Sequence, residues 1–291
     1  MIAKWNLLIT TGALAAASLI LTAGAVAQSP ASNTQNPPPP AAQDKSKAPA
    51  SNTLTLDDPN APAANPEEDA AYKAFTDVPP TETPKRIQAG EALLQKYPNS
   101  RYRQSIYPVL TMSYLQNNQV DKMEEVADKE IALNPNDVQV MAVVAQTLPR
   151  AMNSKTPNPD KQLAKAEQYS KKAIELTPTL PKPATVTDEN FSAVKKQTLA
   201  MAHSGLGLVY IRRGQFSEAI PELNQSVTLD PTPDPVNFYL LGMANAKASH
   251  FDDSAAAYNK CAAIAGTMQE TCKKGAEEAK KLASTQLSAP K

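Results

Sequence analysis

The chain has 291 residues, in which 29 Lys and Arg balance 29 Asp and Glu, and only 5% of the residues are aromatic. This balance argues against nucleic-acid binding, which needs a basic surface and, for single strands, stacking side chains. Two His and two Cys are too few for several metal sites. Proline is frequent, at 26 residues, whereas glycine is scarce, at 9.

Residues 1–27 are predicted to be a signal peptide. A basic start at Lys4 precedes an apolar run, which ends in the small-x-small sequence Ala25-Val26-Ala27 that signal peptidase prefers. The alternative is a retained membrane anchor, because the run approaches the ~20 apolar residues that span a bilayer. We therefore expect an exported protein that is periplasmic, secreted or attached to the cell envelope. Membrane contact is expected only if this segment is uncleaved.

Residues 28–66 are predicted to be a disordered linker. They are rich in Pro, Ala, Ser, Asn and Gln, and Leu54 and Leu56 are their only large apolar residues. Such a composition cannot bury enough surface to offset the entropy of ordering. The four prolines at 37–40 could bind a polyproline-recognising domain, but an extended spacer is the simpler interpretation. Residues 284–291 are predicted to be a disordered tail.

Residues 67–283 have a helical pattern, since apolar residues recur three and four positions apart without strand-like alternation. The sequence Ile131-Ala132-Leu133-Asn134-Pro135 recurs in similar form at 174–178 and at 227–231. Each time, an amphipathic helix ends at a polar residue and a proline that cannot continue it. We expect an unusually long helix from Asp188 to Arg213 and an inserted loop at 153–160.

The clearest repeating unit begins near Ala200 and places small residues where two helices must cross closely. Its characteristic residues are Leu206, Gly207, Tyr210, Gly214, Phe216, Ala219, Leu223 and Pro231. This series resembles the tetratricopeptide repeat (TPR). The resemblance implies an all-α, right-handed superhelical solenoid over residues 67–283. It would contain about five TPR-like helix-turn-helix pairs and a C-terminal capping helix at 267–282.

Cys261 and Cys272 are predicted to form a disulfide. Two cysteines this close in an exported protein usually pair, and the bond would fasten the capping helix to the last repeat. A metal site would need nearby His, and a catalytic thiol would need a basic neighbour. His203 and His250 are far apart in sequence and are interpreted as packing or surface residues. We find no catalytic constellation and predict no enzyme activity, no metal and no cofactor.

In TPR proteins the first helices of successive repeats line a concave groove that binds peptides, and alignment on Gly207 and Gly242 predicts which residues face it. Three basic residues share one repeat position and could attract an acidic segment or a C-terminal carboxylate. The alternative is a chance alignment of solvated charges. The predicted groove residues are Arg150, Met201, Ser204, Leu208, Arg212, Tyr239, Met243 and Lys247, of which Arg150, Arg212 and Lys247 form the basic stripe.

The predicted function is a non-catalytic protein–protein interaction scaffold of the periplasm or cell envelope. Its partner is another protein or a peptide segment bound in the groove, without nucleic acid or a small-molecule cofactor. One alternative is an outer-membrane assembly or cell-division coordinator factor, because residues 91–107 resemble a repeat boundary in such proteins. A second alternative is an enzyme with an unrecognised site at 150–165, where Lys155, Asp160 and Lys161 are ordinary loop charges.

Overall fold

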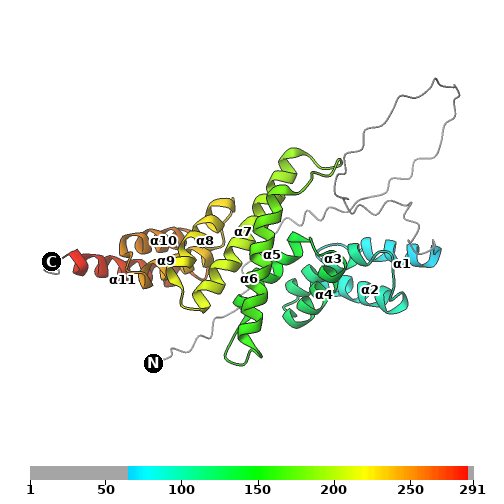
Figure 1. Ribbon diagram of the computed structural model, residues 1–291, viewed down its shortest axis with the longest axis horizontal. Helices are drawn as coiled ribbons and strands as arrows, with labels where there is room; N and C mark the ends of the chain where they lie inside the picture. Colours follow the sequence, from blue (N-terminus) through cyan, green and yellow to red (C-terminus); the bar gives the residue numbers. More distant parts are fainter. Residues whose placement is uncertain (1–64, 288–291) are drawn as a thin grey trace, which may run out of the picture.

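The computed structural model describes residues 65–287 and shows a stack of paired helices (Figure 1). Eleven α-helices follow one another, no β-strand occurs within this range, and each helix packs mainly against its neighbours in the chain. They pair in order as α1/α2, α3/α4, α5/α6, α7/α8 and α9/α10, and α11 closes the stack. The predicted all-α fold of five helix pairs and a cap is confirmed.

The helices have the following bounds: α1 (Pro66–Thr76), α2 (Thr83–Lys96), α3 (Arg103–Gln116), α4 (Val120–Leu133), α5 (Val138–Ala151), α6 (Pro159–Leu176), α7 (Asp188–Arg212), α8 (Phe216–Leu229), α9 (Pro235–Lys247), α10 (Phe251–Ala263) and α11 (Gln269–Leu287). None of these helices is long and apolar enough to cross a membrane. The predicted signal peptide at 1–27 and all but the end of the predicted linker at 28–66 lie outside the described residues. The right-handed superhelix stays a prediction.

Local sequence explains where the helices start and stop. Asn65, Asp137 and Asp234 each precede a helix, and their side chains accept hydrogen bonds from backbone N–H groups of the first turn. Pro135 and Pro231 follow the ends of α4 and α8, as the repeated sequence predicts. These signals divide the chain into helices of similar length that can stack.

Helix α7 is the exception in length, with 25 residues. Thr187 caps it by accepting a hydrogen bond from the N–H of Asn190, and Lys195 donates to the carbonyl of Pro178 in the preceding connector, at 2.7 Å. The predicted long helix and the predicted loop between α5 and α6 are both present. The first turns of α7 extend beyond the rest of the stack (Figure 1).

Helix α5 lies at the centre of the stack and is buried along almost its whole length. It packs against α4, α6 and α7. Its contact with α7 is especially close, because a Cβ atom on Gly205 would lie only 2.7 Å from the carbonyl carbon and oxygen of Ala145. The two backbones therefore touch, and no other residue fits at position 205 without movement of one helix.

The crossings within the last two repeats follow the predicted pattern. A Cβ on Gly207 would lie 2.7 Å from the side chain of Leu223, and one on Gly242 would lie 2.8 Å from the ring of Tyr258. Gly214 adopts a φ of 75° in the turn between α7 and α8, which glycine tolerates best. The small residues of the sequence pattern therefore mark the helix crossings.

Helix α11 covers the open end of the last pair by packing on α10 and α9. Cys261 of α10 and Cys272 of α11 are joined by a disulfide and are both fully buried, with their Cα atoms 5.8 Å apart. The helix continues to Leu287, so the predicted tail from Ser284 begins too early: its first four residues are helical. The last turns of α11 extend past its packing partners (Figure 1).

We expect the purified, non-reduced protein to show no titratable thiols after denaturation. Reduction should lower its free energy of unfolding by about 3 kcal/mol, because the bond closes a short loop in the unfolded chain. A thiol assay in denaturant, with and without reductant, measures the first expectation. Two titratable thiols in the non-reduced protein would contradict the pairing.

Glu130 is a buried carboxyl near the end of α4. The residue is 1% exposed, and its carboxyl group lies near the side chains of Asn134 and Asp137. Burial, followed by the negative charge of Asp137, raises the pKa of Glu130 to about 8. The side chain is therefore a neutral acid in the folded protein at neutral pH.

The Glu130 carboxyl has a pKa near its ordinary value of 4.5 when the chain unfolds. Between pH 4.5 and pH 8, the Glu130 carboxyl is ionised in the unfolded chain but neutral in the folded protein. The free energy of unfolding therefore falls as the pH rises from about 4.5 to about 8. The parent protein should lose on the order of 5 kcal/mol of stability across this range, and Glu130→Gln should abolish this loss. Urea unfolding at several pH values measures it, with the exposed Glu175→Gln on α6 as control. An unchanged pH slope in Glu130→Gln contradicts the assignment.

Candidate functional site

The predicted concave groove is largely filled. Ser204 and Leu208, which are predicted to face the groove, are buried at 0% and 5% exposure. Tyr239 and Met243 are half-buried because they pack against Tyr258 and the apolar face of α11. The stacked helices themselves cover this surface. Of the remaining predicted residues, Met201 is half-buried in the core contacts of α5 and α6, and Lys247 is exposed.

Arg150 is the first residue of the predicted basic stripe, and it binds within the protein. Its Nη1 lies 2.6 Å from the carboxylate of Asp234, the cap of α9, and its Nη2 lies 2.9 Å from the side-chain oxygen of Asn237. Ser204 donates to that same oxygen at 2.8 Å. Arg150 therefore connects the end of α5 to the start of α9 across α7.

Arg212, the second basic residue, binds the preceding repeat. Its Nε donates to the carbonyl of Pro149 and its Nη2 to the carbonyl of Met152, both at 3.0 Å. These carbonyls lie at the end of α5, where intrahelical donors are missing. Two of the three members of the predicted stripe thus bind other repeats of the same chain, and Lys247 is the exposed member.

We expect Arg150→Ala and Arg212→Ala each to lower the free energy of unfolding by about 1–3 kcal/mol, because each leaves partly buried acceptors without a charged donor. Lys247→Ala is the matched control from the same repeat position and should change stability by less than about 0.5 kcal/mol. Denaturant unfolding of the three variants measures the difference. Equal stabilities would contradict the structural role of the arginines.

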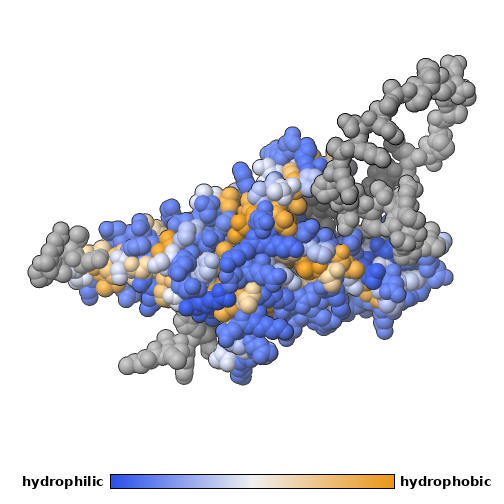
Figure 2. All heavy atoms as spheres, viewed as in Figure 1, coloured by the Kyte–Doolittle hydropathy of each residue, from blue (hydrophilic) through white to orange (hydrophobic). Residues whose placement is uncertain are grey.

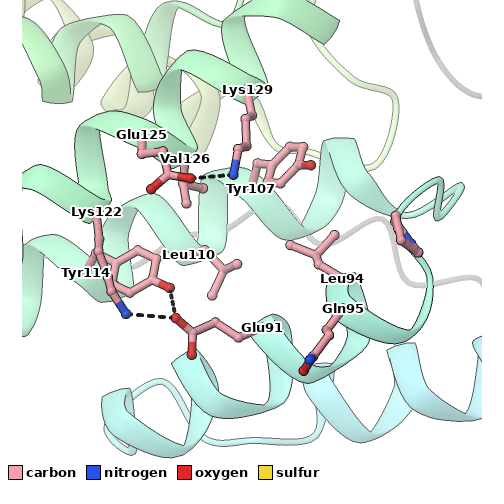
Figure 3. Close-up of a pocket in the computed structure, with 11 residues that line it drawn as sticks. Glu91, Leu94, Gln95, Tyr107, Leu110, Tyr114, Lys122, Glu125, Val126 and Lys129 are labelled. Carbon is pink, nitrogen blue, oxygen red and sulfur yellow. Dashed lines mark hydrogen bonds and ion pairs between the residues drawn. The ribbon is translucent and has the colours of Figure 1, made fainter.

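A hollow of about 380 Å³ lies between α2 and α4, with α3 as its floor (Figure 3). We call it the α2–α4 groove. Leu110 and Tyr107 of α3 are buried beneath it, and Glu91 and Glu125 stand on facing walls. Ligand pockets in proteins have volumes of roughly 300–1,000 Å³. The lining residues are Glu91, Leu94, Gln95, Pro98, Tyr107, Leu110, Tyr114, Lys122, Glu125, Val126 and Lys129.

Ion pairs order the walls of the groove. Glu91 accepts hydrogen bonds from the hydroxyl of Tyr114 and, at 3.0 Å, from Lys122 (Figure 3). The Tyr114 bond and then the Lys122 bond lower the pKa of Glu91, which is therefore ionised at neutral pH. Lys129 donates to Glu125 at 2.7 Å further along α4. The groove thus has an apolar floor and a rim of balanced charge.

The predicted groove residues and the α2–α4 groove share no member. A sequence signal for the second site exists, since Glu91, Leu94 and Gln95 lie at helical spacing on one face of α2, and Pro98 follows the helix at the same spacing. Lys122, Glu125, Val126 and Lys129 repeat this spacing on α4. Leu94 and Val126 pack in the core, and the polar residues beside them are exposed. Such faces on α2 and α4, the second helices of two neighbouring pairs, predict a shared surface between these helices.

Other parts of the described chain are weaker candidates for a binding site. A second hollow, of about 540 Å³, is lined only by the consecutive residues Asn158, Pro159, Asp160 and Lys161 and has no opposing wall. His203 lies 2.7 Å from Glu222, and no group of three or more His, Cys, Asp or Glu within residues 65–287 could hold a metal ion. On the face in Figure 2, hydrophilic residues cover most of the surface. The α2–α4 groove is therefore the candidate site.

Comparison with known families places one repeat in the C-terminal half. Residues 202–233, which span the C-terminal part of α7, all of α8 and the turn after it, match the family model of the tetratricopeptide repeat. The match supports one TPR in this part of the chain. This match coincides with the clearest unit of the sequence pattern, which runs from Ala200 to Pro231. No curated protein matches the chain.

Several solved structures are similar to this chain. A thermophilic TPR protein of Thermus thermophilus is 18% identical, with 73% of this chain and 98% of that chain covered and a TM-score of 0.46. PilW, described as a widely conserved type IV pilus biogenesis factor, is 14% identical, with coverages of 78% and 97% and a TM-score of 0.48. Yeast Tom70 is 16% identical, with coverages of 75% and 39% and a TM-score of 0.46.

Proposed function

We propose that this TPR chain is a non-catalytic protein–protein interaction scaffold that binds a partner segment in the α2–α4 groove. The observation that carries the proposal is the hollow of about 380 Å³ with an apolar floor and ion-paired walls. An apolar floor favours a hydrophobic side chain, and a rim of both charges can orient the polar backbone and side chains around it.

The groove is preorganised for such a segment. Leu110 is 1% exposed and Tyr114 is 3% exposed, so packing already fixes the floor. Glu91 is held by two donors from two different helices, α3 and α4. Binding then requires ordering mainly in the partner, which lowers the entropic cost of association.

We further propose that the scaffold works in the periplasm or the cell envelope. This location rests on the signal-peptide pattern at 1–27, which lies outside the described residues. A role in outer-membrane assembly or cell division is a second candidate. The segment 91–107, whose sequence suggests it, supplies Glu91, Leu94, Gln95, Pro98 and Tyr107 to the groove.

Filling the groove should abolish partner binding. Gln95→Trp places a bulky ring at an exposed position of the lining, and Gln168→Trp is the control at an exposed position of α6. We expect a protein recovered with the parent chain to bind Gln168→Trp equally and Gln95→Trp at least tenfold more weakly, measured by titration of the purified pair. Equal affinities of the two variants, or no recovered protein, would contradict the proposal.

A further inference from the structure

The α2–α4 groove has a closed end and an open end. Helices α2 and α4 run side by side, because Glu91 of α2 pairs with Lys122 of α4 and Gln95 and Pro98 line the same hollow as Lys129. The Glu91–Lys122 pair closes the groove toward the start of both helices. The opposite end lies at the last turn of α2, beside Pro98.

The described chain begins beside the open end. The first turn of α1 is fastened to the last turn of α2, since Glu67 accepts from Lys96 at 3.1 Å and Glu68 accepts from Ser100 at 2.6 Å. Asn65 therefore lies near Pro98. The first described residue is therefore close to the hollow.

The preceding chain contains one segment that suits the groove. Between residues 28 and 64 the large aliphatic residues are Leu54 and Leu56, within the sequence Thr53-Leu54-Thr55-Leu56-Asp57-Asp58. In an extended chain, residues two apart point to the same side. Both leucines can therefore meet one apolar surface, while the two aspartates that follow can approach Lys129.

The tether is long enough to reach the hollow. Residues 57–64 separate Leu56 from Asn65, and an extended chain spans about 3.3–3.6 Å per residue, or roughly 28 Å over these eight. Helix α2, with 14 residues, is about 21 Å long at 1.5 Å per residue. A short flexible tether also gives an effective concentration on the order of millimolar.

We propose that residues 53–58 of this chain, which lie outside the described residues, occupy its own α2–α4 groove. Leu54 and Leu56 lie over the apolar floor, and Asp57 and Asp58 face Lys129. The inference rests on the proposed function, because it names the groove's resting occupant.

Disulfide trapping in the full chain tests the occupancy. Asp58→Cys lies on the same side of the extended segment as the two leucines. It is combined either with Gln95→Cys in the groove lining or with Ala70→Cys, an exposed position of α1 that is also close to Asn65. We expect the intramolecular crosslink to position 95 to be at least fivefold more abundant than the crosslink to position 70. Leu54→Ser with Leu56→Ser should reduce the crosslink at position 95 to the level seen at position 70.

Equal crosslinking to both positions, insensitivity to the leucine changes, or crosslinks formed only between chains would overturn the inference. The measurement is separable from the partner titration. A leucine-dependent crosslink at position 95 without any recovered partner supports the inference and refutes the proposed function. Partner binding that depends on Gln95, without the crosslink, refutes the inference and supports the proposed function.

Discussion

The contact between α5 and α7 is the constraint on which the rest of the stack depends. Gly205 brings the two backbones together at Ala145, and α5 is buried by its neighbours on nearly every side. Pro149 contributes to this approach, because proline has no N–H to donate to the carbonyl four residues earlier, which is that of Ala145. The same carbonyl lies against Gly205. The hydrogen bond that Pro149 cannot donate and the absence of a side chain at Gly205 therefore coincide at the carbonyl of Ala145.

Polar contacts extend this central contact in both directions. Arg212 satisfies carbonyls at the end of α5, and Arg150 reaches from α5 to the start of α9. Further out, Lys165 of α6 pairs with Glu124 and Asp128 of α4. Each of these contacts joins different helix pairs and adds to the apolar contacts between neighbouring repeats.

The fold could be predicted because its signals are local. Prolines after α4 and α8, the cap at Thr187 and the small residues at helix crossings all act within one or two turns of the chain. The ligand-binding role of the basic stripe could not be judged this way. Arg150 meets Asp234, which is 84 residues away, and only the stacking of three repeats brings the acceptor to the guanidinium. The α2–α4 groove needs the same long-range information, since its two walls come from separate repeats.

The stability of a Gly205→Ala variant tests the central contact most directly. Alanine favours an isolated helix over glycine by about 1 kcal/mol, so local propensity alone predicts a more stable protein. The close approach to Ala145 predicts instead a loss of about 1–3 kcal/mol in the free energy of unfolding, because one helix must move. Ser192→Ala, at an exposed position of the same helix, is the control. A Gly205→Ala protein as stable as the parent would contradict the backbone contact between α5 and α7.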